Sequence, residues 1–319
     1  MSREFTKTGK TNKGPFEASV SANRQIGQLF YRLKLDFCDT AAEAFAAARP
    51  GQFAQLDLSR TILPVPEDIP DNLRDVARRN IVLRRPFSFC DIVCESEKTS
   101  VEILYKVVGP ASLRMTTLSG GDLISIIGPL GNGFRIPDNK KRALLVIGGI
   151  GAGPLQHLAK VLTEEHSEEE VVAFVGARSA KELPFEGRLD DIAQSLGFSF
   201  REFAKYGINS IVATDDGSLG HKGPVTECFE QWLGRTRMVY EETIIYGCGP
   251  EEMLAELVRI ASERGIDCQV NMERMMACGI GICQSCAVKC RTDDSNETVY
   301  KLCCEDGPVF DGREVVFNL

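Results

Sequence analysis

The order of apolar and polar positions changes near residue 140 and divides the chain into two long stretches. Before that point, short apolar runs alternate with turn residues, and strand candidates lie at 29–37, 52–58, 101–108 and 122–127. Many short strands with frequent turns predict a small antiparallel β-barrel. A polar, proline-bearing stretch at about 59–80 interrupts the series, so we expect a surface insertion between two barrel strands there.

After residue 140, strand-like runs alternate with helical patterns. The strands are expected at 143–148, 171–177, 210–213 and 242–246, and the helices at 155–164, 183–196, 225–233 and 250–263. This alternation predicts a parallel sheet with helices on both faces. The chain has 319 residues, which is more than one core normally accommodates, so we expect a multi-domain β plus α/β fold. The predicted units are a β-barrel at 15–138 that includes the insertion, an α/β nucleotide-binding domain at 139–264 and a cysteine-rich domain at 265–319.

Charge and hydropathy exclude several classes of partner. The chain carries 45 acidic and 37 basic residues, a net charge of -8 that would repel a nucleic-acid backbone. The first residues contain no apolar leader, and glycines break the longest apolar stretch, at 143–155. We therefore expect no nucleic-acid partner, no membrane span and a cytoplasmic location.

Twelve cysteines are many for a chain without an export signal, which favours metal or redox use over disulfides. Cys278, Cys283 and Cys286 follow the plant-type spacing of a 2Fe-2S cluster, with four and then two intervening residues. Cys290 lies close to the loop, and spacing alone does not choose the fourth ligand between Cys303 and Cys304. Zinc or buried free thiols are the alternative, although only one C-x-x-C unit is present.

Two glycine-containing turns follow predicted strands of the α/β stretch. In the first, the amides of Gly149, Gly151 and Gly153 can face a dinucleotide pyrophosphate at a helix start, although the pattern is not G-x-G-x-x-G and a turn without a ligand stays open. The second turn is Gly247-Cys248-Gly249-Pro250, where Cys248 is either a buried small residue or a thiol near a nicotinamide. The second strand ends without the acidic residue that selects NAD, so NAD and NADP both remain open.

The segment 84–89 offers a guanidinium and a hydroxyl on one face of a strand, two pleats apart. Such a pair can clamp a flavin, or it can lie on a solvated face.

A series of motifs resembles a known family and favours the flavin interpretation of this segment. The motifs follow one another in the order RPFS, LYKVVG, GPLGNGF, GGIGAGPL, YGCGPEEML and MMACGIGICQSC, and the last motif is CEDGPVFDGREVVF. In this order they resemble the electron-transfer subunits of dihydroorotate dehydrogenase B, within the ferredoxin-reductase-like iron-sulfur flavoproteins. The resemblance runs from about 51 to 317, apart from the insertion.

The resemblance implies FAD, a 2Fe-2S cluster and NAD(H) as the redox groups. It assigns FAD binding to Arg85, Pro86, Phe87, Ser88, Leu104, Tyr105 and Lys106. A glycine-threonine pair of the family falls on Ala111 and Ser112, which keeps the hydroxyl but loses the glycine. The family places its last cysteine directly before Glu-Asp-Gly-Pro, so it selects Cys304 as the fourth cluster ligand.

The implied activity is transfer of electrons between NAD(H) and a partner subunit whose FMN oxidises dihydroorotate to orotate in pyrimidine biosynthesis. No side-chain acid or base is required, and this chain alone is not expected to oxidise dihydroorotate. A heterotetramer with two copies of each subunit is implied, and Ile280, Ile282 and Gln284 are candidate docking residues.

Two other functions stay open from the sequence. One is an electron-transfer subunit of a sulfide dehydrogenase, a ferredoxin-NADP transhydrogenase or a hydrogenase. The other is a binding module in which the cysteines hold zinc.

Overall fold

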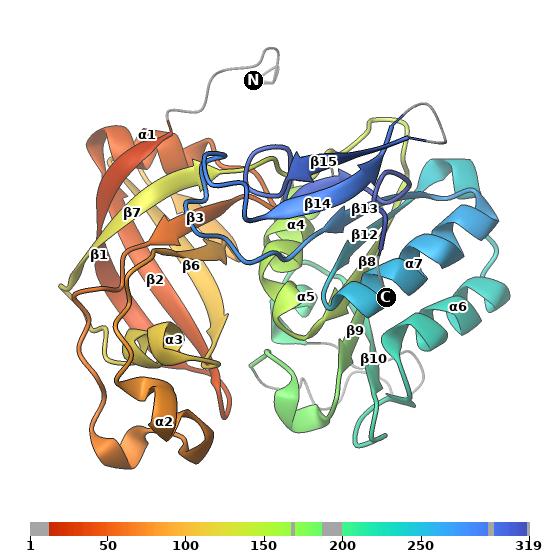
Figure 1. The fold of residues 1–319 in the computed structure, drawn as a ribbon. Helices are drawn as coiled ribbons and strands as arrows, with labels where there is room; N and C mark the ends of the chain where they lie inside the picture. Colours follow the sequence, from red (N-terminus) through yellow and green to blue (C-terminus); the bar gives the residue numbers. More distant parts are fainter. Residues whose placement is uncertain (1–12, 167–169, 187–199, 293–296, 318–319) are drawn as a thin grey trace.

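The computed structural model describes residues 13–166, 170–186, 200–292 and 297–317. Two seven-stranded sheets form its two halves, and a smaller C-terminal hairpin lies at the top of the half that contains the second sheet (Figure 1). No helix in these ranges is long and apolar enough to cross a membrane.

The first sheet is antiparallel throughout and has the strand order β4-β3-β7-β1-β2-β6-β5. Its strands are β1 (Gly14–Gln25), β2 (Phe30–Cys38), β3 (Phe53–Leu56), β4 (Arg85–Ser88), β5 (Asp91–Cys94), β6 (Lys98–Lys106) and β7 (Leu123–Leu130). Alternate residues of β2, among them Leu33, Leu35 and Phe37, are buried inside the curled sheet. The sheet curls until β4 approaches β6, which is the barrel that the short-strand pattern predicts.

Helix α1 (Asp39–Ala46) closes one end of the barrel and was not expected from the strand pattern. Its Phe45 is fully buried, stacks on Phe37 at a ring-centroid distance of 3.9 Å and meets Phe16 and Phe89 edge-on. The alanine-rich sequence of this helix favours helix formation, because alanine loses little entropy there.

The expected insertion lies between β3 and β4. It forms the short helices η1 (Pro66–Asp68), η2 (Asp71–Leu73) and α2 (Arg74–Ala77), beside α3 (Pro110–Met115). Leu73, Ala77 and Ile81 are buried in the barrel core, so the insertion is packed against the barrel and is not wholly a surface feature.

The second sheet has the order β11-β10-β9-β8-β12-β13-β16 and is parallel except for its last pair. Its strands are β8 (Arg142–Gly148), β9 (Glu170–Ala177), β10 (Asn209–Thr214), β11 (His221–Lys222), β12 (Thr243–Cys248), β13 (Asp267–Asn271) and β16 (Val309–Asp311). The chain runs from β8 toward β9 on one side and returns to β12 on the other. Their carboxyl ends form the point where open α/β sheets bind ligands.

Helices cover both faces of this sheet, as the alternating pattern predicts. They are η3 (Gly149–Gly151), α4 (Ala152–Glu165), η4 (Ala180–Glu182), α5 (Arg201–Ala204), α6 (Val225–Arg235), η5 (Tyr240–Glu242) and α7 (Glu251–Arg264). Helices α6 and α7 pack on one face, whereas α4 lies on the other face and also contacts β5 and β6 of the barrel. The helix expected at 183–196 falls largely on residues 187–199, which lie outside the described residues, and residues 183–186 are not helical.

The cysteine-rich end of the chain is shared between two structures. Strands β13 and β16 extend the second sheet, while β14 (Ala287–Arg291) and β15 (Thr298–Leu302) form a separate hairpin. Asn132, two residues after β7, donates to the backbone oxygens of Glu305 and Asp306 at 3.1 and 2.9 Å. The C-terminal segment is therefore attached to the barrel as well as to the α/β sheet.

A buried charge network joins the barrel to the α/β half. The Arg32 side chain on β2 is 8% exposed and contacts Glu102 at 2.5 Å, Glu202 at 3.2 Å and the Gln156 oxygen at 3.0 Å. Glu102 belongs to the barrel, whereas Gln156 and Glu202 lie on α4 and α5. A second link joins Lys160 to Asp91 at 2.7 Å.

Replacing Arg32 with alanine leaves the buried Glu202 carboxylate without its cation. We expect a loss of about 3–5 kcal/mol in the free energy of unfolding, as for other broken buried pairs. Arg24→Ala is the matched control, because Arg24 is 56% exposed and its pair with Glu186 should contribute only about 0–1 kcal/mol. Urea unfolding of both variants measures the difference, and equal losses would contradict the network's role.

Candidate functional site

A cavity of about 390 Å³ opens where the barrel, the α/β sheet and the start of the C-terminal segment meet. The barrel contributes β4 and β6, and the α/β sheet contributes the turns after β8 and β12. The end of β13 and the stretch after it close the third side with Asn271, Met272, Glu273, Arg274 and Met276. This composite wall places residues from all three predicted units around one space.

Most of the predicted flavin residues line this cavity. Pro86, Phe87 and Ser88 reach it from β4, and Leu104, Tyr105 and Lys106 reach it from β6. Tyr105 is held by a stacked contact with Tyr31 at 5.3 Å and donates to Asn23 at 3.1 Å. Burial raises the pKa of Tyr105, so this hydroxyl stays protonated.

Three predicted contacts lie elsewhere. The Arg85 guanidinium donates to the backbone oxygen of Leu83 at 2.7 Å and does not line the cavity. Ala111 and Ser112 are buried in α3, where the Ser112 hydroxyl accepts from the amides of Val108 and Gly109. A flavin role for these three residues stays a prediction. The neighbouring Arg84 binds Ser125, so it holds β7 against the segment that leads into β4.

The two glycine turns pack directly against each other. A Cβ atom on Gly151 would lie 2.2 Å from the Cys248 carbonyl oxygen, so only glycine permits this approach. Gly153 lines the cavity together with Cys248. Burial raises the pKa of the Cys248 thiol, so it is protonated at neutral pH.

The other residues that the sequence predicted in these turns do not line the cavity, although Ile150 of the first turn does. Gly149 has a φ of +51°, which a residue with a side chain rarely adopts, and it begins η3. Gly247 leaves room for Leu254 and Leu257 of α7. Gly249 packs against Gly148 of the first turn, and Pro250 precedes α7. Their roles in cofactor binding also stay predictions.

The loop from Cys278 to Cys286 turns its backbone amides toward sulfur atoms. The amides of Ile280 and Cys283 donate to Cys278 Sγ at 3.5 and 3.4 Å, and the Gly281 amide donates to Cys304 Sγ at 3.2 Å. Amide donors of this kind stabilise the thiolates that hold an iron-sulfur cluster. Gly279 and Gly281 have φ values of +72° and +82°, which allow the loop to bend around these sulfurs.

The pKa values of two predicted ligands, Cys283 and Cys304, are shifted in opposite directions. A hydrogen bond with the Ser285 hydroxyl lowers the pKa of the exposed Cys283 to about 6. Burial, together with a hydrogen bond to the Cys286 thiol, raises the pKa of Cys304 to about 12. In the described part of the chain, no three His, Cys, Asp or Glu side chains gather closely enough to hold one metal ion. The fit to a cluster therefore rests on the amide donors around the sulfurs.

The remaining cysteines of this region point into the core. Cys303 is fully buried and donates to the Met272 carbonyl oxygen at 3.3 Å, away from the loop. Cys290 is fully buried on β14. The structure thus places the Cys304 sulfur beside the loop, whereas the Cys303 sulfur points into the core.

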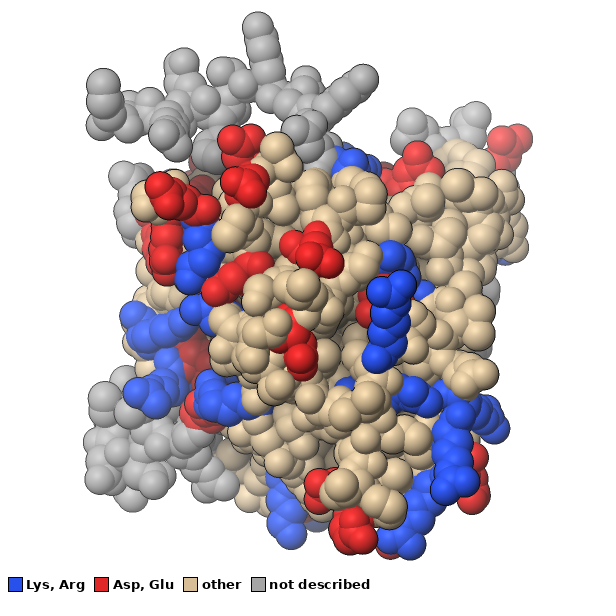
Figure 2. Space-filling view, turned by 90° about the vertical axis from the view of Figure 1, so that its left-hand side faces the viewer, with Lys and Arg blue, Asp and Glu red and all other residues tan. Residues whose placement is uncertain are grey.

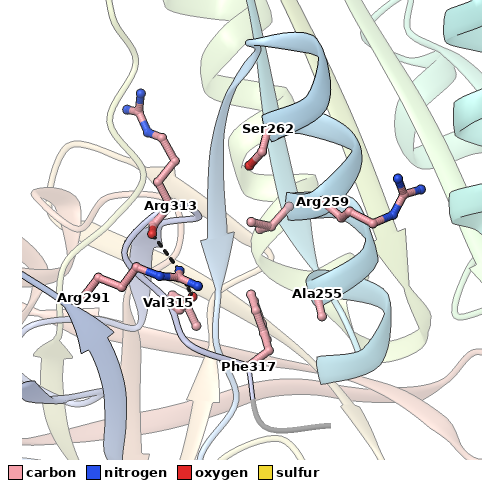
Figure 3. A pocket seen from close by; sticks show the side chains of 8 residues that line it. Ala255, Arg259, Ser262, Arg291, Arg313, Val315 and Phe317 are labelled. Atoms are coloured by element: carbon pink, nitrogen blue, oxygen red, sulfur yellow. Dashed lines mark hydrogen bonds between the residues drawn. The ribbon is translucent and has the colours of Figure 1, made fainter. Parts of the chain in front are cut away.

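A second hollow lies beside α7 and the end of the chain (Figure 3). Three arginines line it, but Arg291 donates to the backbone oxygens of Arg313 and Val315, and Arg313 pairs with Asp311 at 2.7 Å. Arg259 pairs with Glu256 and Glu263. These cations already have partners, so the cavity between the sheets is the better candidate.

The barrel side of the molecule shows charges of both signs (Figure 2). Acidic side chains gather on its upper part, while lysines and arginines lie mainly along the flanks and the lower end. Among the side chains described on this face, no continuous basic surface is available for a phosphate backbone.

Sequence reasoning missed part of the cavity wall. Phe53 and the stretch 271–274 line it without belonging to any motif that the sequence analysis singled out. The signal that could have pointed to 271–274 is its position between a buried strand and the cysteine loop.

Family models match two segments of the chain. Residues 145–259 match a model described as an oxidoreductase NAD-binding domain, and residues 273–316 match the iron-sulfur cluster binding domain of dihydroorotate dehydrogenase B. The chain is 32% identical over 301 residues to the dihydroorotate dehydrogenase B (NAD(+)) electron transfer subunit of Caldanaerobacter subterraneus subsp. tengcongensis, covering 94% of this chain and 98% of the relative. It is 35% identical to the subunit of the same name from Listeria monocytogenes, with the same coverage.

The chain belongs to the family of dihydroorotate dehydrogenase B electron transfer subunits. The resemblance seen in the sequence motifs is thereby confirmed. The iron-sulfur match at 273–316 decides against the zinc interpretation of the cysteines.

Solved structures agree with the fold class of this electron transfer subunit family. The structure of an NADH-dependent reduced ferredoxin-NADP oxidoreductase superposes with a TM-score of 0.69 at 26% identity, covering 94% of this chain and 90% of that one. A ferredoxin NADP+ reductase from Neisseria gonorrhoeae superposes with a TM-score of 0.54 at 15% identity, covering 79% and 92%, and shows the fold alone. The ferredoxin-reductase-like fold is thus confirmed, whereas the domain boundaries and the individual site residues stay predictions.

The two adjacent cysteines provide a direct test of the cluster site. We expect Cys304→Ala to abolish the cluster, because its sulfur accepts the Gly281 amide at the loop. Cys303→Ala should retain the cluster and lose only packing in the core. Iron and sulfide analysis of the two purified variants, together with visible absorbance, measures the outcome. Cluster loss in Cys303→Ala with retention in Cys304→Ala would reverse the assignment.

Proposed function

We propose that the chain links NAD(H) to the catalytic subunit of a dihydroorotate dehydrogenase through FAD and a 2Fe-2S cluster. The observation that carries this proposal is the single cavity walled by the barrel strands, the glycine turns and the stretch that leads into the cysteine loop. A protein that passes electrons between NAD(H), FAD and an iron-sulfur cluster needs the three groups in adjacent sites. The cavity supports this proposal because its walls come from all three predicted domains.

The residues around the cavity fit a flavin. Phe87, Leu104 and Tyr105 present apolar and aromatic surface, while Ser88 and Lys106 present a hydroxyl and an ammonium. FAD bound there would supply the conversion between two-electron hydride transfer and the one-electron transfer of an iron-sulfur cluster. Cys278, Cys283, Cys286 and Cys304 are the proposed cluster ligands.

The protein's own contribution is to bind, orient and exclude water. The turn at Gly151 and Cys248 brings both carboxyl ends of β8 and β12 to the cavity, where a nicotinamide can enter beside Gly153. The Cys248 thiol is 2% exposed and protonated, so it offers contact surface without a charge. No general acid or base is assigned.

The partner surface is proposed to surround the cysteine loop. Ile280 is 44% exposed and Ile282 is 76% exposed, although large apolar side chains are normally buried. Exposed apolar residues beside a redox site suit a partner that receives or donates electrons there. With Gln284 they form the proposed docking surface, and we propose a heterotetramer with two copies of each subunit and a cytoplasmic location.

A ferredoxin-linked role is the second candidate, because a solved structure with 26% identity and a TM-score of 0.69 comes from an NADH-dependent ferredoxin-NADP oxidoreductase. The relatives at 32% and 35% identity carry the dihydroorotate dehydrogenase name. The partner that binds the purified chain distinguishes the two roles.

Anaerobic titration with NADH tests the whole relay. We expect flavin bleaching in the visible spectrum and a rhombic electron paramagnetic resonance signal from the reduced 2Fe-2S cluster. NADPH in a parallel titration tests the nucleotide preference. Folded protein that has been reconstituted with FAD, iron and sulfide and still shows neither change would refute the proposed function.

Replacing Ile282 with glutamate tests the docking surface. We expect normal reduction by NADH but at least tenfold weaker binding to the catalytic subunit, because a charge would be desolvated in the interface. Val239→Glu is the control, since Val239 is 55% exposed and precedes β12, at the edge opposite its carboxyl end. Binding is measured by calorimetry, and equal affinities for both variants would exclude Ile282 from the interface.

A further inference from the structure

Gln55 is a buried polar residue that no hydrogen bond explains. It lies on β3, its exposed fraction is 0%, and neither its Nε2 nor its Oε1 atom has a partner among the described residues. Buried amides are almost always hydrogen-bonded, because an unpaired donor loses its bond to water and gains nothing in exchange. An unpaired amide in the core therefore indicates a partner that is not part of the polypeptide.

The side chain of Gln55 points at the cysteine loop. A Cβ atom built on Gly279 would lie 2.3 Å from Gln55 Nε2 and 2.6 Å from its Cγ, so the amide rests directly against the Gly279 backbone. Gly279 follows Cys278, whose sulfur already accepts the amides of Ile280 and Cys283. The free Nε2 donor therefore lies beside the part of the loop that wraps these sulfurs.

A second buried glutamine, three residues earlier in the chain, has hydrogen-bond partners for both atoms of its amide. Gln52 is 2% exposed, its Oε1 accepts the Arg49 amide at 2.8 Å, and its Nε2 donates to the Gly131 oxygen at 2.7 Å. Both amide atoms of Gln52 therefore form hydrogen bonds within the barrel domain. The two glutamines differ in location, because the Gln55 side chain lies against the cysteine loop, whereas Gln52 bonds to the barrel backbone.

We propose that Gln55 Nε2 donates a hydrogen bond to a sulfur atom of the bound cluster and raises its reduction potential. The inference rests on the proposed function, since it requires the cluster at Cys278, Cys283, Cys286 and Cys304. A reduced cluster carries one more negative charge than the oxidised cluster. A donor aimed at its sulfur stabilises the reduced form more, which raises the potential.

In this role Gln55 belongs to the barrel but tunes the reduction potential of a cluster that the C-terminal loop holds. The other donors to these sulfurs in the described structure are the amides of Ile280, Gly281 and Cys283 and the Ser285 hydroxyl, and all of them belong to the loop itself. Gln55 instead belongs to β3, which pairs with β4 of the proposed flavin site. The cluster potential then depends on how closely the loop is seated on the flavin-binding barrel.

The test replaces Gln55 with methionine, which retains the length and removes the donor. In a redox titration of the reconstituted protein followed by electron paramagnetic resonance, we expect the ratio of reduced to oxidised cluster to fall roughly three- to tenfold at a fixed potential. For one electron this equals a downward shift of about 30–60 mV. The flavin potential, measured from the visible spectrum of the same samples, should not change.

Gln52→Met is the matched control. It removes two satisfied hydrogen bonds, so it should lower the thermal unfolding midpoint and leave the cluster potential unchanged. If Gln55→Met does not assemble a cluster, Gln55→Asn, which withdraws the amide by one methylene, is titrated with the same expectation.

Two results would overturn the inference. One is an unchanged cluster potential in a Gln55 variant that retains its cluster. The other is a shift of the flavin potential alone, which would make the flavin the partner of the amide. Failure of the proposed function is a different result, because the unsubstituted protein would then show no cluster signal.

Discussion

The face at which α4 packs against β5 and β6 sets the spacing between the two sheets, and the cavity depends on it. Leu104 and Cys90 of the barrel share one buried cluster with Leu155 and Leu158 of α4. Within that face the Arg32 guanidinium is surrounded by carboxylates from both halves. Buried ion pairs contribute little net stability, but they require a specific geometry, because a displaced partner leaves a charge without solvent.

With that spacing set, glycine decides how closely the cofactor turns can approach. Gly151 lies against the Cys248 carbonyl and Gly249 against Gly148, so the two turns meet backbone to backbone. A similar approach occurs at Gly279, where the cysteine loop rests on the Gln55 side chain. The same physical property, the absence of a Cβ atom, therefore shapes both the nucleotide side and the cluster side of the molecule.

The electrostatics of the cluster site come from the backbone. Three loop amides point at the sulfurs of Cys278 and Cys304, and the Ser285 hydroxyl lowers the pKa of Cys283. Fixed dipoles of this kind stabilise thiolate charge without introducing a mobile cation. The apolar side chains of Ile280 and Ile282 remain at the surface of the same loop, where a partner can cover them.

The sequence alone determined the kind of each element and the chemistry of its motifs. Apolar spacing indicated the barrel strands and the alternating α/β elements, because local periodicity reports which face of a strand or helix is buried. Cysteine spacing indicated the cluster, but it could not separate Cys303 from Cys304 without a family resemblance. The strand pattern also missed α1, whose alanine-rich sequence favours a helix.

Tertiary structure decided which residues meet. It turned Cys303 into the core and Cys304 toward the loop, and it directed the Arg85 guanidinium away from the cavity that Phe87 and Tyr105 line. It also placed Gln55 of the barrel against Gly279 of the cysteine loop. Such contacts join residues far apart in the chain, and they depend on how sheets and loops pack in three dimensions, which no local pattern of residues encodes.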